Sequence, residues 1–212
     1  MNKNLWLRRI RNICGILGGL LPFIAIFSVL LIKGRPVHSL YSISATYYLS
    51  PALPAILTAA SICLMTYDGY SKIDDFITTI TGVFGLGIVL FPCSVDWMSG
   101  TDKVGFFQVP MHYSNLVHCA CAGIFFVLLA INCWFLFTKT DDFETVTENK
   151  KKRNMIYRIC AVVMLAFEIW QVITCNVSFF SGWWTMVNEI GLLISFCVAW
   201  ITKGGLILKD KE

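Results

Sequence analysis

Residues 13–32 read ICGILGGLLPFIAIFSVLLI, a run of 20 residues without a charged side chain. As an α-helix this run would rise about 30 Å, the thickness of the hydrocarbon core of a bilayer. It follows three arginines, as the apolar region of a signal peptide would. However, it is too long for such a region and continues into Lys33, Gly34 and Arg35 instead of a small-x-small cleavage site. We therefore predict a retained membrane-spanning helix.

Further apolar blocks of about 17 to 25 residues recur along the rest of the chain. They cover residues 51–67, 76–92, 114–137, 156–175 and 184–202. Only 14% of the 212 residues are charged and the mean hydropathy is +0.69, whereas soluble domains carry about 25% charged residues. The sequence thus predicts an all-α fold, an integral membrane bundle of six transmembrane helices that occupies residues 1–212 as a single domain.

The basic residues predict how this bundle is oriented. Of the 17 Lys and Arg residues, fourteen fall on one predicted side and three on the other, namely Lys33, Arg35 and Lys103. By the positive-inside rule the richer side is cytoplasmic, and an even number of helices places both termini there. We expect a multi-pass protein of the cell membrane whose partners are membrane lipids. The net charge of +4 does not indicate a nucleic-acid site, because the basic residues flank apolar segments and form no patch with exposed aromatics.

Small residues recur at one-turn spacing within several predicted helices. Gly15 and Gly19 form a Gly-x-x-x-Gly face, and Ser114, His118 and Ala122 form a narrow stripe. Such faces let helix backbones approach closely in lipid, so we interpret them as packing surfaces rather than as a pore lining. No internal repeat is visible in the sequence, and the inverted-repeat plan of many transporters is therefore not indicated.

Three ionisable residues fall inside predicted helices: His118, Glu168 and Glu189. A charged group at the centre of a membrane helix costs about 2.5–3.5 kcal/mol on insertion scales, which makes such residues good indicators of function. With the predicted orientation, all three lie in the outer half of the bilayer. Glu168 and Gln171 share one helical face, which we expect to look into the bundle.

The predicted outer loops contribute further polar residues. Ser44 lies in the run SISATYY at 42–48, Asp96 follows the third helix and His112 precedes the fourth. With His38, all three histidines of the chain map to the outer side. We therefore predict a polar cavity that opens outward, with no residue assigned a catalytic role. Its candidate ligand-binding residues are Ser44, Asp96, His112, His118, Glu168 and Glu189.

Each of these residues also has a simpler explanation, because most polar side chains in membrane bundles hydrogen-bond to a neighbouring helix. The coincidence of several on one side favours a site. A zinc site made of His38, Asp96, His112 and His118 has suitable chemistry. Yet His112 and His118 do not share a helical face, and no H-E-x-x-H pattern occurs. Metal binding stays open at this point, and no phosphate-loop or nucleophile-elbow motif indicates a cofactor.

The nine cysteines form no Cys-x-x-Cys pair and fall mostly inside apolar blocks. A thiol in such a place packs as a small hydrophobic group. Cys93, Cys119, Cys121 and Cys175 lie near the predicted outer face, and the sequence leaves open whether any two of them form a disulfide.

Three segments together resemble a known family. They are SISATYY at 42–48, GLGIVLFPCSVD at 85–96 and HYSNLVH at 112–118. The arrangement resembles a bacterial family of six-span membrane proteins of unknown function, which is distantly similar to the eukaryotic autophagy-modulator type of six-span protein. The resemblance covers most of the chain and implies six helices. It implies no activity.

Three functions are compatible with these features. The first is a non-enzymatic protein that binds or senses a lipid or small amphiphile in the outward-facing cavity, and the absence of a catalytic motif favours it. The second is a small transporter or channel subunit in which Glu168 and Glu189 relay a proton or cation. The third is a metal-dependent membrane hydrolase. The sequence does not indicate whether the chain forms an oligomer.

Overall fold

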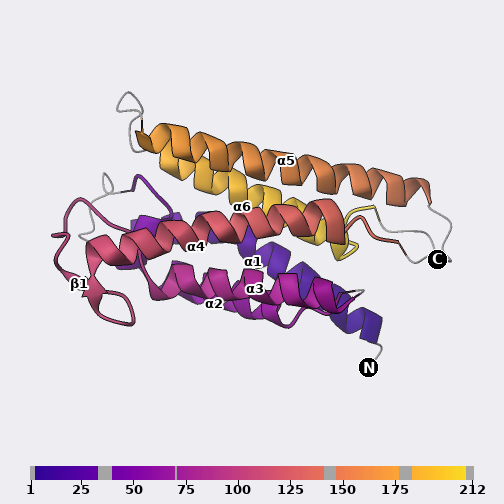
Figure 1. Cartoon of the computed structure of the whole chain (residues 1–212), viewed down its shortest axis with the longest axis horizontal. Coiled ribbons are helices and arrows are strands. Elements are labelled where there is room, and N and C mark those ends of the chain that lie inside the picture. Colours follow the sequence, from indigo (N-terminus) through magenta and orange to yellow (C-terminus); the bar gives the residue numbers. More distant parts are fainter. Residues whose placement is uncertain (1–2, 33–39, 70, 141–146, 177–182, 209–212) are drawn as a thin grey trace.

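The computed structural model describes residues 3–32, 40–69, 71–140, 147–176 and 183–208. Within them, six α-helices run side by side along the longest axis of the molecule (Figure 1). The only strands in this part of the chain are a short antiparallel pair, β1 (Lys103–Val104) and β2 (Val109–Pro110). The helices are α1 (Lys3–Leu31), α2 (Ala52–Met65), α3 (Lys72–Leu90), α4 (Met111–Ile131), α5 (Glu148–Asn176) and α6 (Trp183–Lys203).

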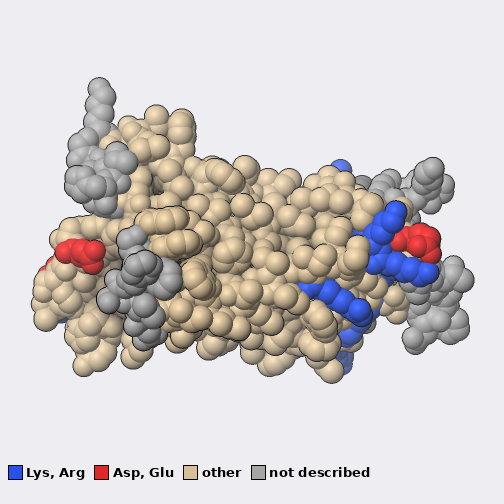
Figure 2. Space-filling view, turned by 90° about the horizontal axis from the view of Figure 1, so that it is seen from above, with Lys and Arg blue, Asp and Glu red and all other residues tan. Residues whose placement is uncertain are grey.

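Five of these helices are long and apolar enough to cross a bilayer: α1, α3, α4 with its continuation to Leu136, α5 and α6. Their outward sides carry large apolar side chains, among them Phe27 on α1 and Ile169 on α5, which are 61% and 63% exposed. Water-soluble proteins rarely expose such continuous apolar surface. On the face shown in Figure 2, a broad uncharged band separates the charged side chains at the two ends. The predicted all-α membrane bundle is therefore confirmed.

The two ends of the bundle differ in what they carry. The β1–β2 hairpin lies at one end, hereafter the hairpin end, on the left of Figure 1. The described chain begins and ends at the other, hereafter the terminal end. There Asn12 on α1 donates a hydrogen bond to the carbonyl oxygen of Gly204 at 3.3 Å, and Arg153 on α5 donates to that of Leu208 at 2.6 Å. The basic side chains visible in Figure 2 gather at this terminal end.

The helices extend beyond the apolar blocks at the terminal end. Whereas the blocks start at residues 13 and 156, α1 begins at Lys3 and α5 at Glu148. Apolar length reports only the part of a helix that crosses hydrocarbon. The polar first turns of α1 and α5 therefore escaped the sequence pattern, although they continue the same helices.

The segment before α2 was expected to be an outer loop, but its described part is folded into the bundle. A 3₁₀-helix, η2 (Ser44–Tyr48), lies here, and Ala45 and Thr46 within it are fully buried. The Thr46 hydroxyl donates to the carbonyl oxygen of Ile43 at 2.6 Å, and Ile43 belongs to the main apolar core. The helix that follows, α2, starts at Ala52, close to the predicted start, and has 14 residues, which rise about 21 Å.

Small residues allow the closest helix contacts. A Cβ on Gly82 of α3 would lie 2.5 Å from the carbonyl oxygen of Ser61 on α2, and one on Gly15 of α1 would lie 2.9 Å from the Cβ of Trp200 on α6. Real Cβ atoms do not approach so closely, so these positions bring helix backbones together. This agrees with their interpretation as packing surfaces.

Aromatic side chains fill the terminal half of the bundle. Phe137, which follows the π-helical turn η3 (Asn132–Leu136) at the end of α4, is fully buried. Its ring centroid lies 4.6 Å from that of Trp200 on α6 and 5.4 Å from that of Tyr157 on α5. Offset and edge-to-face aromatic pairs at such distances stabilise a core beyond the burial of their area. The terminal half is therefore closely packed.

The terminal end also holds an ion pair that the sequence patterns did not predict. Asp74, in the first turn of α3, is 1% exposed, and its Oδ1 lies 2.5 Å from the Nζ of Lys139. The Ser71 hydroxyl donates to the same carboxylate oxygen at 3.0 Å and caps the helix by accepting from the Asp74 amide. The chain after η3 thus returns over the start of α3 and covers a carboxylate that would otherwise face solvent.

Candidate functional site

A cavity of about 580 Å³ lies in the hairpin half of the bundle. Helices α4, α5 and α6 and the segment before η2 surround it, and Figure 1 shows the α5–α6 pair diverging from α4 toward this end. Two of its lining residues, Cys119 on α4 and Val172 on α5, are exposed. Ser94, which lies between α3 and β1, is an exposed lining residue at the hairpin end.

The lining is divided into a polar and an apolar part. Polar lining residues such as Asn115, Gln171 and Thr185 lie within the first or last two turns of their helices at the hairpin end. Farther along the helices, the lining residues Phe125 of α4 and Leu193 of α6 are apolar. Four of the six predicted site residues line the cavity: Ser44, His118, Glu168 and Glu189.

His118 joins α4 to the end of α3. Its Nδ1 lies 2.9 Å from the carbonyl oxygen of Phe91 and 3.3 Å from that of Ile88. A carbonyl oxygen only accepts, so Nδ1 carries the proton and donates, and Nε2 is left as an acceptor. The last carbonyls of a helix lack partners within the helix, so His118 caps α3. Among the described residues Nε2 makes no hydrogen bond, and it is available to a molecule in the cavity.

Glu189 on α6 holds the segment before η2. Its carboxylate accepts hydrogen bonds from the amides of Ile43 and Ser44 at 2.5 and 3.1 Å. It also accepts from the hydroxyls of Ser42 and Ser44 at 2.9 and 2.6 Å. Four donors from one short segment converge on this side chain, so Glu189 fixes the wall of the cavity that this segment forms.

Glu168 on α5 differs from Glu189 because its carboxyl group makes no hydrogen bond to any described residue. It is half-buried and lines the cavity, and its Oε2 would lie 3.9 Å from a Cβ on Gly123 of α4. One turn farther along α5, the side-chain oxygen Oε1 of Gln171 accepts a hydrogen bond from the side-chain amide of Asn188 on α6 at 2.7 Å. The face that carries Glu168 and Gln171 does look into the bundle, and Glu168 is its unpartnered member.

Asp96 and His112, the other two predicted residues, lie outside the cavity lining. Both are exposed. His112 Nδ1 lies 2.8 Å from the carbonyl oxygen of Gly100, and its ring packs on Tyr113. Asp96 is close enough to affect the cavity residue Tyr41. The pKa of Tyr41 is raised to about 12, first by burial and then by the negative charge of Asp96. Asp96 therefore belongs to the rim, and His112 to the hairpin.

The zinc hypothesis gains no support from the described residues. No three His, Cys, Asp or Glu side chains among them come together as metal ligands would. His112 bonds to the hairpin while His118 caps α3, so the two imidazoles face different neighbours. His38 lies outside the described residues.

Cys93, Cys119 and Cys121 form no disulfide in the described part of the chain, and the side chain of Cys175 lies outside the described residues. Cys93 and Cys119 both line the cavity. Burial raises the pKa of the Cys93 thiol, and the nearby Glu189 carboxylate and Cys119 thiol raise it further. Cys93 therefore stays a neutral thiol at physiological pH.

Several lining residues were missed by the sequence analysis, although a helical-spacing rule would have found some of them. Asn115 precedes His118 by one turn, and Thr185 precedes Glu189 by one turn. Residues so spaced share a helical face. Tyr41 and Ser42 carried no such signal, because they reach the cavity through the unexpected burial of their segment.

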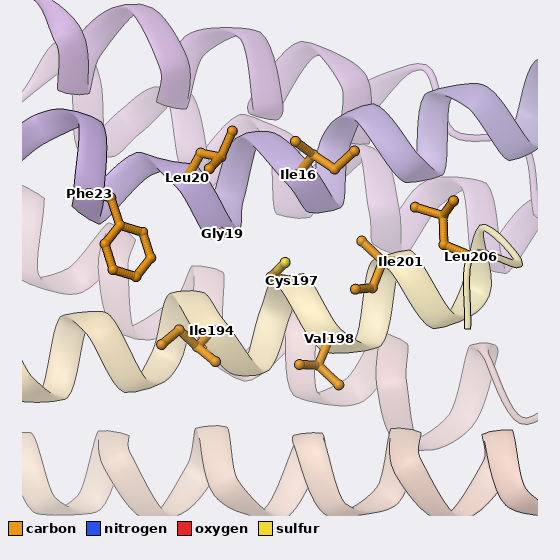
Figure 3. Close-up of a pocket in the computed structure, with 9 residues that line it drawn as sticks. All are labelled: Ile16, Gly19, Leu20, Phe23, Ile194, Cys197, Val198, Ile201 and Leu206. Carbon is orange, nitrogen blue, oxygen red and sulfur yellow. The ribbon is translucent and has the colours of Figure 1, made fainter. Parts of the chain in front are cut away.

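A second hollow, of about 320 Å³, lies between α1 and α6. Figure 3 shows lining residues from both helices, including Phe23 and Leu20 from α1 and Ile194 and Ile201 from α6. Apart from the Cys197 thiol, its lining offers no polar side chain that could orient a ligand. We therefore take the cavity with Glu168 and Glu189 as the candidate site.

Comparison of the chain with protein-family models, curated proteins and solved structures finds no match. The candidate site must therefore be interpreted from its own residues.

Proposed function

We propose that this chain is a non-enzymatic membrane protein that binds or senses a lipid or small amphiphile in the cavity. Ligand sites in proteins measure about 300–1,000 Å³ and combine a mostly apolar lining with a few convergent polar groups. The cavity, at about 580 Å³, has this size and this composition. Its apolar part suits a hydrocarbon tail and its polar part suits a head group.

The observation that carries the proposal is that two lining residues of the cavity, Cys119 on α4 and Val172 on α5, are exposed. Both residues lie on helices that are long and apolar enough to cross a bilayer. Entry between α4 and α5 would let a ligand dissolved in the membrane reach the cavity from the hydrocarbon region. The exposure of lining residues on these two helices therefore favours a membrane-borne ligand.

We also propose that α2 crosses the membrane, which gives six spans. At the hairpin end, the Ser50 hydroxyl just before α2 donates to that of Ser28 on α1 at 2.7 Å. At the terminal end, Arg11 on α1 donates to the carbonyl oxygen of Asp68 just after α2 at 3.4 Å. Arg11 and Ser28 are about 26 Å apart along the axis of α1. Although short, α2 therefore extends over most of the apolar thickness.

With six spans, both termini lie on one side, and we propose that this side is the cytoplasm. Support comes from the distribution of Lys and Arg, because the sequence predicts fourteen of the 17 on the terminal side. The cavity would then open in the outer half of the cell membrane. The resemblance of three short segments to a bacterial family of six-span proteins agrees with this arrangement and adds no activity.

Filling the cavity tests the function. Ala122 on α4 lines the cavity, whereas Ala120, two residues away, is exposed and does not line it. We expect Ala122→Trp to abolish the binding of a fluorescent long-chain amphiphile to the purified protein in nanodiscs, and Ala120→Trp to leave it unchanged. Both variants should melt within a few degrees of the wild type. If Ala122→Trp bound the amphiphile as tightly as Ala120→Trp, the cavity would not be the binding site.

A further inference from the structure

We infer that the cavity selects amphiphiles whose head group is a primary ammonium cation, an inference that rests on the proposed function and names its ligand class. The chemistry of the polar part of the lining points to a cation that donates hydrogen bonds. Three features carry the inference: the sign of the charge in the lining, the acceptors that it leaves unused, and the position of these acceptors relative to the apolar part.

The lining carries acidic side chains and, in the part of the chain that the structure describes, neither Lys nor Arg. Glu168 and Glu189 both line it. The four hydrogen bonds to Glu189 come from neutral amides and hydroxyls, so no cation among the described residues pairs with it. At the hairpin end the described basic residue is Lys103, which is exposed on β1 and does not line the cavity. An anionic head group would meet like charge here and no counter-charge from the described lining.

The unused groups of the lining are acceptors. Glu168 makes no hydrogen bond to a described residue. Nε2 of His118 carries an unprotonated lone pair, because Nδ1 holds the proton and donates it to carbonyl oxygens at the end of α3. A carboxylate that is partly withdrawn from water without a partner is costly, and a bound cation that hydrogen-bonds to it removes that cost. A primary ammonium has three N–H donors. It therefore has enough donors for Glu168 and His118 together, whereas a hydroxyl head group has a single donor and no charge.

The acceptors are placed for an amphiphile with its head toward the hairpin end. Along their helices, His118 lies about 10 Å and Glu168 about 12 Å from that end. Phe125 lies about 21 Å from it on α4, and Leu57 on α2 adds to the apolar lining. A ligand held by its ammonium group at Glu168 would therefore place its hydrocarbon chain against apolar side chains.

Three probes that differ only in head group test the inference: dodecylamine, dodecanol and dodecyl phosphate. Their binding to the full-length protein in nanodiscs would be measured by native mass spectrometry, with empty nanodiscs as the blank. We expect the wild type to bind dodecylamine at least tenfold more tightly than either of the others. We expect Glu168→Gln to reduce this preference to near parity without weakening the binding of dodecanol. Glu148→Gln, at an exposed position of the terminal end, is the matched control and should keep the wild-type preference.

The outcomes separate this inference from the function on which it rests. If all three probes bound equally, or dodecyl phosphate bound best, or Glu168→Gln kept the preference for dodecylamine, the ammonium inference would be overturned. Binding that Ala122→Trp abolishes would in that case still support an amphiphile site. If no probe bound in a way that Ala122→Trp weakens, the proposed function itself would fail.

Discussion

Glu189 and Ser44 are joined by two hydrogen bonds, from the amide of Ser44 at 3.1 Å and from its hydroxyl at 2.6 Å. The two residues are 145 positions apart in the sequence. Their contact ties α6 to the segment that precedes α2 and so closes one wall of the cavity. Both oxygens of a carboxylate can accept these hydrogen bonds. A side-chain amide in the same place would turn its NH2 group, which is a donor, toward an N–H or O–H group that is also a donor.

Replacing Glu189 by Gln should loosen this wall. A hydrogen bond to a charged group contributes about 1.5–3 kcal/mol, so we expect a loss of at least this order and a lower Tm in detergent. Hydrogen exchange of the amides of Ile43 and Ser44 should accelerate, because both donate to Glu189. Glu168→Gln is the control and should not lower the Tm, because the Glu168 carboxyl group makes no hydrogen bond to a described residue. Unchanged melting and exchange in Glu189→Gln would show that the segment is held by other contacts.

His118 should be needed for the stability of α3 independently of any ligand. His118→Ala removes the donor from the carbonyls of Ile88 and Phe91, and an unsatisfied buried acceptor costs about 1–3 kcal/mol. His118→Asn places a side-chain amide donor close to the position of Nδ1 and should recover part of the loss. Because Asn lacks Nε2, it should still bind dodecylamine more weakly than the wild type. Thermal unfolding and native mass spectrometry of the two variants separate the structural role from the binding role. If His118→Ala and His118→Asn were equally stable, the capping role would be excluded.

Removing Lys139 and removing Asp74, the two members of the ion pair at the terminal end, should lower the stability of the protein by different amounts. Asp74 is 1% exposed, whereas Lys139 is 41% exposed. Lys139→Met leaves a buried carboxylate without its cation and should cost about 3 kcal/mol or more. Asp74→Asn leaves Lys139 free to reach water and should cost less. The comparison is made by unfolding both variants in detergent, with the exposed pair Glu148–Lys151 as a control that should have no measurable effect. A larger loss in Asp74→Asn would contradict this order.

The helices were predictable because a bilayer imposes a minimum apolar length on each span. The run at 13–32 needed no knowledge of its neighbours. A polar cavity toward one end of the bundle was also predictable in outline, since Ser44, His118, Glu168 and Glu189 are polar residues within or next to apolar segments and all four line the cavity.

What the sequence could not show depends on contacts between distant residues. Nothing near Ser42 or Ser44 indicates that Glu189 lies opposite, so their segment was expected in a loop. Asp96 and His112 have the right chemistry, but Asp96 lies in the exposed connection between α3 and α4 and His112 is exposed in the first turn of α4, and neither lines the cavity. Residue type and predicted side of the membrane do not distinguish a rim residue from a lining residue.

The proposed orientation can be tested in intact cells. An epitope inserted at Ser99, which is exposed near the β1–β2 hairpin, should be accessible to antibody without permeabilisation. An epitope added at the C-terminus should be detected only after permeabilisation, because fourteen of the 17 Lys and Arg residues are predicted on that side. Equal access to the two epitopes without permeabilisation would contradict the six-span arrangement. Access to the C-terminal epitope alone would reverse the orientation.

Two glycines that look alike in the sequence should respond in opposite ways to replacement by Ala. Gly82 lies where a Cβ would be 2.5 Å from the carbonyl oxygen of Ser61, so Gly82→Ala must push α2 and α3 apart and should lower the Tm. Gly123 faces the cavity, where the nearest atom would be Glu168 Oε2 at 3.9 Å. There Ala fits without displacement, and its better helix propensity should stabilise the protein by about 0.5–1 kcal/mol. Unfolding of the two variants in the same detergent measures the contrast. A loss of stability in Gly123→Ala as large as that in Gly82→Ala would mean that α4 and α5 are packed together at Gly123, and that the cavity is closed there.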